Sequence, residues 1–288
     1  MGKLILGTVQ MGLDYGVNNS FGKISIEESH QILVKAYTSG ITILDTAEAY
    51  GNAHQVIGVF HKNQPNYKFQ IITKVPHSFE ANSIEIKVKK YLADLVVNCL
   101  DVLMFHSFES FINNPKAINV LVDLKSKGYI NHIGVSVYTN NQMEYLLNED
   151  KISVVQLPFN LLDNNTIRGD LIKQLKAKGK IIHTRSAFLQ GLFFKNMNDK
   201  NKIVQKLHSE LEILRQITLQ SSCSMEQLAL SYCIQQQNID NVIIGVDSMS
   251  HLEANLKASS YTIGVESIKL INTIKVKDID LLNPSLWK

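Results

Sequence analysis

The chain has few cysteines, and their spacing suggests neither a disulfide framework nor a metal site. It contains three cysteines, Cys99, Cys223 and Cys233, and no Cys-x-x-Cys pair. An odd number of thiols within or beside apolar patterns predicts buried, reduced side chains. The nine histidines show neither His-x-His nor His-x-x-x-His spacing, so no metal is predicted.

Long apolar runs and strong net charge are also absent. No apolar stretch approaches the length that crosses a membrane, and the first residues lack the features of a secretory signal. The formal charge is +3, and no run of like charges would attract nucleic acid or a membrane surface. The sequence therefore predicts a cytoplasmic protein that binds small molecules rather than nucleic acid or membrane.

Strand and helix patterns alternate along the chain. Apolar runs such as Ile41–Leu44 do not alternate with polar residues, which predicts strands that are covered on both faces. Amphipathic segments separate them; Ser25–Ser39, for example, starts with a capping-box pattern. We therefore predict an α/β fold, a (β/α)8 TIM barrel in a single domain over residues 1–288. Two further helices, Lys202–Thr218 and Met225–Gln237, are expected as an insertion between the seventh and eighth strands.

Polar residues stand at or just beyond the carboxyl ends of three successive predicted strands. Asp45 ends the second strand and Tyr50 follows it, Lys74 ends the third, and His106 ends the fourth. In a parallel barrel these ends share one rim, where active sites are found. Each residue alone has a structural explanation, as a helix cap, a snorkelling lysine or a core histidine. Together on one rim they favour a single site.

These segments resemble the motifs of the aldo-keto reductase family. The resemblance rests on DTAEAYG (Asp45–Gly51), ITKV (Ile72–Val75), VLMFHSF (Val102–Phe108), Gly134–Ser136, Gln156–Asn160 and Gly245–Asn255. The matches follow the family's order from near residue 4 to about residue 258. The resemblance implies an NAD(P)(H)-dependent carbonyl reductase or alcohol dehydrogenase, active as a monomer or weak oligomer.

The resemblance implies that Asp45, Tyr50, Lys74 and His106 form the catalytic tetrad. Tyr50 would give a proton to the carbonyl oxygen. The pKa of a free phenol is about 10, and a nearby Lys74 ammonium would lower it. Asp45 would hold Lys74 in place and keep it charged, and His106 would donate a hydrogen bond that orients the substrate.

The resemblance further implies that an extended nicotinamide dinucleotide lies over the rim, with NADP(H) as the family default and NAD(H) as the alternative. Ser136 and Gln156 would hold its carboxamide. Arg185 stands where the family has an aromatic side chain, and it would stack on the nicotinamide or meet an anionic group of the substrate or the pyrophosphate. The predicted cofactor-binding residues are Thr8, Ser136, Gln156, Arg185, Ser186, Leu189, Gly191, Gly245, Asp247, Ser248, His251 and Asn255.

Aromatic residues in the rim loops are the predicted substrate contacts, because loops carry specificity in such barrels. They are Tyr15, Phe21, Phe108, Tyr138, Phe159 and Phe188. The segments GTVQMGLDYG (Gly7–Gly16) and RSAFLQGL (Arg185–Leu192) resemble a bacterial branch associated with sugar-type substrates, which makes a sugar or polyol carbonyl a candidate.

Two other functions remain open at this stage. One is a nicotinamide-binding sensor or regulatory barrel with little turnover, against which the intact tetrad argues. The other is a cofactor-independent lyase or isomerase in which Lys74 forms a Schiff base. The Asp, Tyr and His residues around Lys74 argue against this reading.

Overall fold

Eight parallel strands close into a barrel in the computed structural model, which describes residues 2–16, 19 and 22–287. Each strand pairs with the next along the chain, and β8 pairs with β1. The predicted (β/α)8 barrel is therefore confirmed. The strands are β1 (Leu4–Gly7), β2 (Ile43–Asp45), β3 (Gln70–Val75), β4 (Leu100–Phe105), β5 (Ile130–Ser136), β6 (Val154–Pro158), β7 (Ile181–Arg185) and β8 (Asn241–Gly245).

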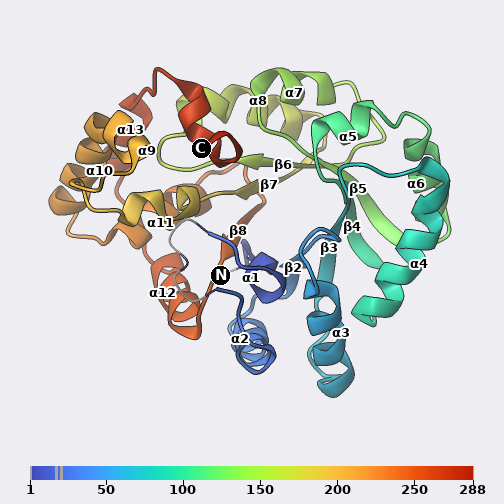
Figure 1. The fold of residues 1–288 in the computed structure, drawn as a ribbon. Coiled ribbons are helices and arrows are strands. Elements are labelled where there is room, and N and C mark those ends of the chain that lie inside the picture. Colours follow the sequence, from blue (N-terminus) through green and yellow to red (C-terminus); the bar gives the residue numbers. More distant parts are fainter. Residues whose placement is uncertain (1, 17–18, 20–21, 288) are drawn as a thin grey trace.

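The helices surround these strands (Figure 1). The α-helices are α1 (Val9–Gly12), α2 (Ile26–Thr38), α3 (Ala53–Asn63), α4 (Ile84–Leu95), α5 (Phe108–Ile112), α6 (Ala117–Ser126), α7 (Asn140–Leu146), α8 (Asn165–Ala177), α9 (Lys202–Lys206), α10 (His208–Gln220), α11 (Met225–Ile234), α12 (Met249–Ser259) and α13 (Val265–Thr273). Short 3-10 helices are η1 (Ala81–Ser83), η2 (Leu189–Phe194), η3 (Ile279–Leu282) and η4 (Pro284–Leu286).

The segment between β7 and β8 differs in detail from the two helices expected there. It contains η2, α9, α10 and α11. The predicted helix Lys202–Thr218 is divided at Leu207, whose backbone leaves the helical region at φ −101° and ψ 16°. The helices α1 and α5 were not predicted, because four and five residues are too few to show a helical period.

The start of α2 shows how a local signal can be diverted by tertiary structure. The Ser25 side chain accepts a hydrogen bond from the Glu28 N–H, as the capping pattern predicts. The Glu28 carboxylate does not complete the box, however. It accepts a hydrogen bond from the Met249 N–H at the start of α12, 3.3 Å away.

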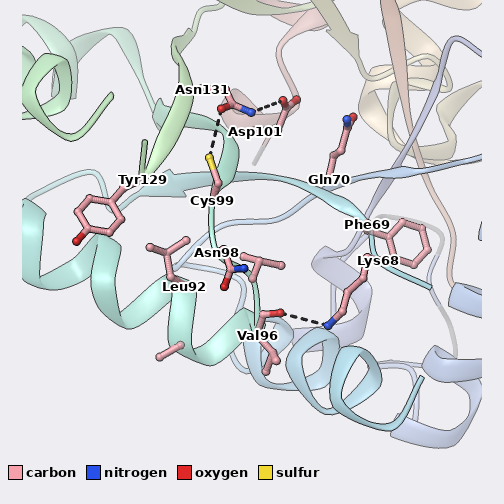
Figure 2. Close-up of a pocket in the computed structure, with 12 residues that line it drawn as sticks. Lys68, Phe69, Gln70, Leu92, Val96, Asn98, Cys99, Asp101, Tyr129 and Asn131 are labelled. Atoms are coloured by element: carbon pink, nitrogen blue, oxygen red, sulfur yellow. Dashed lines mark hydrogen bonds between the residues drawn. The ribbon is translucent and has the colours of Figure 1, made fainter. Parts of the chain in front are cut away.

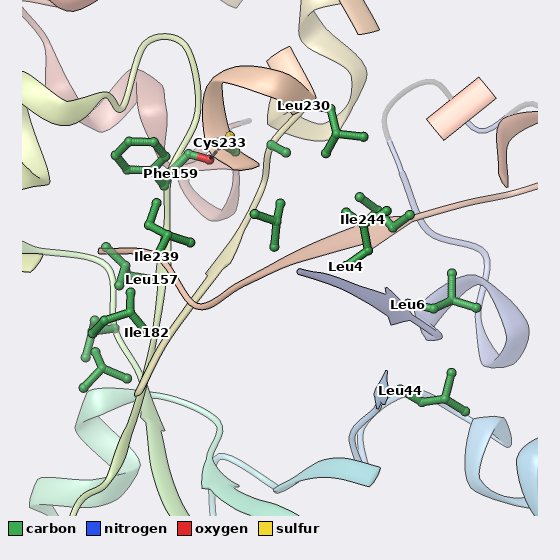
Figure 3. Packing of buried hydrophobic residues seen from close by; sticks show 14 of the residues in the cluster. Leu4, Leu6, Leu44, Leu157, Phe159, Ile182, Leu230, Cys233, Ile239 and Ile244 are labelled. Carbon is green, nitrogen blue, oxygen red and sulfur yellow. Dashed lines mark hydrogen bonds between the residues drawn. The ribbon is translucent and has the colours of Figure 1, made fainter. Parts of the chain in front are cut away.

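The strands are buried on both faces. Leu4 and Leu6 of β1 belong to the large core between strands and helices, whereas Ile5 belongs to a smaller cluster with Ile72 and Val102 of other strands. This is the alternation expected of successive strand residues. Figure 3 shows Leu4, Leu6, Leu44 and Ile244, all of the large core, on neighbouring strands. Burial of both faces explains why the strand sequences are mostly apolar and lack a regular alternation of polar and apolar residues.

The same alternation aims polar side chains into the mouth of the barrel. The residues Ile43, Ile72 and Val154 pack in or against the smaller cluster. Two positions further along their strands come Asp45, Lys74 and Gln156, respectively. A step of two residues keeps the same face, so these three side chains follow the apolar layer at the carboxyl ends of the strands.

Two further properties concern the described part of the chain. None of its helices combines the length and the apolar character needed to cross a membrane. Its cysteines carry no disulfide, and only Cys233 is buried, while Cys99 and Cys223 are half-buried. The prediction of buried thiols is therefore wrong for the last two, which lie in connections, Cys99 just before β4 and Cys223 between α10 and α11.

Candidate active site

A buried ion pair lies at the centre of the rim. Lys74 Nζ is 2.5 Å from Asp45 Oδ1, and the two side chains are 2% and 5% exposed. Lys74 Nζ also donates to the Thr46 carbonyl oxygen, 3.2 Å away. Burial disfavours the ammonium, but the Asp45 carboxylate outweighs burial and holds the pKa of Lys74 above its usual value. Lys74 is therefore a fixed positive charge at neutral pH.

The Tyr50 hydroxyl lies beside this pair. Lys74 Nζ donates to it at 3.4 Å. Burial raises the pKa of Tyr50 above 10, although the Lys74 charge acts to lower it. The predicted net lowering of this pKa is therefore wrong, because the cost of burying a phenolate exceeds the stabilisation from an ammonium that Asp45 already pairs. The phenol consequently keeps its proton at neutral pH and is available as a donor.

His106 faces Tyr50 and is a neutral imidazole. Their ring centroids are 5.9 Å apart. Burial, with the nearby charges of Lys74, His77 and Arg185, lowers the pKa of His106 to about 3. Its Nδ1 atom is buried and has no hydrogen-bond partner among the described residues. A neutral imidazole can donate one N–H to an oxygen atom in the site.

His77 is a rim residue that the sequence analysis missed. Its ring stacks on that of His106, with 4.5 Å between centroids and 20° between planes. It stands three positions after Lys74, just past the end of β3. The same strand-end signal that identified Lys74 and His106 could have found it.

Three predicted cofactor residues lie on the same rim as the ion pair, and two of them form hydrogen bonds with Asp45. Gln156 Nε2 donates to the second oxygen of Asp45 at 2.9 Å. Ser136 is aligned with Gln156 across β5 and β6. The Thr8 hydroxyl donates to the Asp45 backbone oxygen at 3.1 Å and is fully buried. These contacts bring the three residues to the same rim, and their cofactor roles stay predictions.

Arg185 lies at the end of β7 with its guanidinium over the Tyr138 ring, 4.1 Å from the ring centroid. It donates to the Val137 carbonyl oxygen at 3.3 Å and to the Ser186 hydroxyl at 3.4 Å. Ser186, Leu189 and Gly191 follow in a turn whose φ angles are positive, and the Leu189 side chain is buried in the core. The side chain of Leu189 is thus not open to a cofactor.

The remaining predicted cofactor residues meet where β8 leads into α12. Ser248 caps α12 by accepting from the His251 backbone N–H, and the Asp247 carboxylate contacts the His251 ring. Gly245 ends β8, and Asn255 is buried in α12. With the Glu28 carboxylate at the Met249 N–H, this helix start carries two carboxylates.

The predicted substrate aromatics do not form one group. Tyr15 is exposed and accepts a hydrogen bond from Gln190 Nε2 at 2.8 Å, which links the first rim loop to the β7 loop. Tyr138 lies under Arg185. Phe108 packs edge-on against Phe111 and Tyr145. The Phe188 ring packs against that of Phe194 at a tilt of 47°. Phe21 lies outside the described residues.

Phe159 is not a substrate contact in this structure. It is fully buried, and its ring stacks on Tyr232 with 5.5 Å between centroids. The side chain fills the core between β6 and α11 instead of facing the rim, because it lies one residue beyond Pro158 on the outward face.

Gly12 lies against the loop that carries Tyr50. A Cβ atom at Gly12 would be 1.8 Å from the Tyr50 backbone oxygen, a distance that real Cβ atoms do not adopt. We expect Gly12→Ala to displace this loop and to destabilise the protein by about 1–3 kcal/mol, as overpacking does. Chemical denaturation of the variant measures this. Gly264→Ala is the control, because its Cβ would meet nothing within 4 Å. Equal midpoints for the two variants would contradict the contact.

A separate hollow of about 930 Å³ lies at the other end of the barrel. Its lining includes Gln70, Asp101 and Asn131, which stand at the starts of β3, β4 and β5. Figure 2 shows the side chain of Asn131 hydrogen-bonded to those of Cys99 and Asp101 there. Active sites of such barrels lie at the carboxyl ends of the strands, so this hollow is distinct from the candidate site.

Comparisons with known proteins bear on the family and the fold of this chain. A family model described as "Aldo/keto reductase family" matches residues 3–276. An NADH-specific methylglyoxal reductase of Escherichia coli is 22% identical over 264 residues, covering 78% of this chain and 81% of that protein. An L-glyceraldehyde 3-phosphate reductase of Escherichia coli is 23% identical over 287 residues, covering 85% and 83%.

Solved structures show the same fold. The holo form of an aldo-keto reductase from Bacillus halodurans superposes with a TM-score of 0.78 at 21% identity, covering 95% of this chain and 92% of that one. A glycerol dehydrogenase from Gluconobacter oxydans superposes with a TM-score of 0.76 at 18% identity, covering 94% and 90%.

Proposed function

Because the chain belongs to the aldo-keto reductase family, and is thus an oxidoreductase, we propose that it reduces an aldehyde or ketone to an alcohol with Tyr50 as the proton donor. The observation that carries this proposal is the rim arrangement of a protonated Tyr50 phenol, 3.4 Å from the Lys74 ammonium and beside a neutral His106. The coenzyme, when bound, supplies a hydride to the carbonyl carbon.

Residues of the chain supply the proton and stabilise the charge that its transfer leaves behind. As negative charge develops on the carbonyl oxygen, the Tyr50 hydroxyl delivers its proton there. The resulting phenolate lies next to the Lys74 ammonium, which stabilises it, and Asp45 keeps that ammonium charged and in place. The neutral His106 donates a hydrogen bond to the same oxygen and fixes its position.

Two features of the rim fit a nicotinamide dinucleotide. The Gln10 Oε1 atom is buried without a partner among the described residues, and the backbone of Gly245 lies beside that amide. The start of α12, an eleven-residue helix, suits a phosphate group. Gln10 and Ser136 would contact the nicotinamide end, and Ser248 the adenosine end.

The same helix start bears on the choice between NADP(H) and NAD(H). The carboxylates of Glu28 and Asp247 lie there, and His251 is engaged by Asp247. Because like charges repel, these carboxylates disfavour the additional 2′-phosphate that NADPH carries. We therefore expect NADH to be used at least as well as NADPH, although NADP(H) is the family default.

A Schiff-base role for Lys74 has less support. It requires a neutral amine as the nucleophile, whereas the pKa of Lys74 is raised by Asp45. The carbonyl reductase is the function that the charge states of the site favour.

The test is a screen of coenzyme oxidation with aldehydes, ketones and sugars, each with NADH and with NADPH. Turnover of a carbonyl substrate, with a KM for NADH no higher than that for NADPH, is expected. Tight coenzyme binding without turnover of any compound would instead support a nicotinamide-binding sensor. A much lower KM for NADPH than for NADH would contradict the expected coenzyme preference but would leave the proposed carbonyl reduction intact.

A further inference from the structure

We propose that Arg185 binds an anionic group of the substrate, so that the preferred substrates are carbonyl compounds that also carry a carboxylate or a phosphate. This inference rests on the proposed carbonyl reductase function. It adds the chemical class of the substrate and assigns the residue that selects it.

Arg185 has N–H donors that form no hydrogen bond, and it has no anionic partner among the described residues. No ion pair includes it among the described residues, and its two hydrogen bonds, of 3.3 and 3.4 Å, go to neutral oxygen atoms. A guanidinium carries five N–H donors, and its bonds to carboxylates or phosphates are shorter, about 2.7–2.9 Å. Arg185 is also half-buried, so water satisfies its charge only in part. These are the properties of an anion-binding group without its anion.

The guanidinium is held in place by its surroundings. Its plane lies over the Tyr138 ring, and the Tyr138 carbonyl oxygen in turn accepts a bond of 2.7 Å from the buried Arg168. Arg168 forms two bonds, of 2.6 and 2.9 Å, with Asp163. The close contacts of Asp163 are therefore with Arg168; the Arg185 charge acts on Asp163 from further away, without an ion pair between the two. A fixed guanidinium binds an anion at a lower entropic cost than a mobile one does.

The position of Arg185 points to the substrate as the source of the anion. Arg185 ends β7, so it lies on the same rim as Tyr50 and His106, the two groups proposed to meet the carbonyl oxygen, and its charge acts on both. The other cation of this centre, Lys74, is already paired with Asp45. Arg185 is therefore the cation at this rim that forms no ion pair among the described residues. The coenzyme pyrophosphate offers the same chemistry, but several bonds separate it from the nicotinamide ring.

The test compares matched neutral and anionic substrates. The pairs are butanal with succinic semialdehyde, and glyceraldehyde with glyceraldehyde 3-phosphate. The ratio of kcat/KM for the anionic to the neutral member is measured for the wild type, Arg185→Gln and Arg185→Lys. Lys178→Gln, which removes an exposed charge near the opposite end of β7, is the control. Coenzyme Kd values are measured for every variant by fluorescence titration.

The wild type is expected to prefer at least one anionic member by tenfold or more. Arg185→Gln should lower that ratio by about 10- to 100-fold, the usual effect of losing a charged hydrogen bond, while Arg185→Lys retains part of it. Lys178→Gln should leave it unchanged. Equal losses for neutral and anionic substrates would overturn the proposal, and a loss confined to the coenzyme Kd would assign Arg185 to the pyrophosphate.

A failure of the proposed function would be seen separately, as a wild type that turns over neither member of any pair. In that case succinate binding to the coenzyme complex is measured by calorimetry. Succinate binding that Arg185→Gln weakens at least tenfold would uphold the anion site, and binding that the variant leaves unchanged would refute it.

Discussion

Replacing Tyr50 with phenylalanine is expected to reduce kcat for carbonyl reduction by about 10²–10⁴-fold, the range typical for loss of a general acid. The phenol is the group near Lys74 that both holds a proton at neutral pH and could release it to a ligand. Phenylalanine keeps the ring and its edge-on contact with His106, so the shape of the site should survive. Single-turnover rates with saturating coenzyme measure the effect.

Coenzyme binding separates this chemical role from a structural one. The coenzyme Kd of Tyr50→Phe should stay within about threefold of the wild-type value, because the proton donor acts on the substrate oxygen. Tyr67→Phe, which changes a phenol in the loop before β3, is the matched control and should retain full kcat. A Tyr50→Phe enzyme with nearly normal kcat would end the assignment of Tyr50 as the acid.

Replacing Asp45 with alanine should destabilise the protein by about 3–5 kcal/mol, because it strands the Lys74 ammonium in the interior without a counter-charge. Lys74 is 2% exposed, so water cannot take the place of the carboxylate. Gln156 would lose its acceptor on Asp45 as well. Urea denaturation at pH 7 measures the change in the free energy of unfolding.

The double variant Asp45→Ala/Lys74→Met gives the sharper result. Removing both charges leaves no unpaired ion, so the double variant should be more stable than Asp45→Ala alone. The exposed pair of Asp123 on α6 with Lys127, which follows this helix, is the control, and Asp123→Ala should change stability far less. If the double variant loses as much free energy of unfolding as Asp45→Ala and Lys74→Met lose together, the two charges are not coupled in the way that their 2.5 Å separation implies.

The barrel could be predicted because its signals are local. Largely apolar, β-branched segments such as Ile41–Leu44, followed by capped amphipathic helices, admit few arrangements other than parallel strands with helices outside them. Parallel strands bring their carboxyl ends to one rim. The sequence could therefore predict that Asp45, Lys74 and His106 lie on one rim, although they are far apart in the chain.

Contacts at the rim could not be predicted in the same way, since they depend on loop geometry and burial. The Glu28 carboxylate was expected to cap its own helix, yet it bonds to Met249 in α12. Phe159 was expected at the rim, yet it lies in the core against Tyr232. Arg185 was expected to stack on the nicotinamide or meet an anionic group, and its contact with the Tyr138 ring was not predicted. Each outcome joins residues from different elements of the barrel.

The sequence by itself determined the order of strands, the rim on which they end and the residue types that line it, because the two-residue period of strands is a local property. Only the tertiary structure decided the charge states. Burial raises the pKa of Tyr50 where the residue types alone suggested a lowering, and it keeps His106 neutral. The physical reason is that desolvation depends on every atom packed around a group, which no spacing along the chain records.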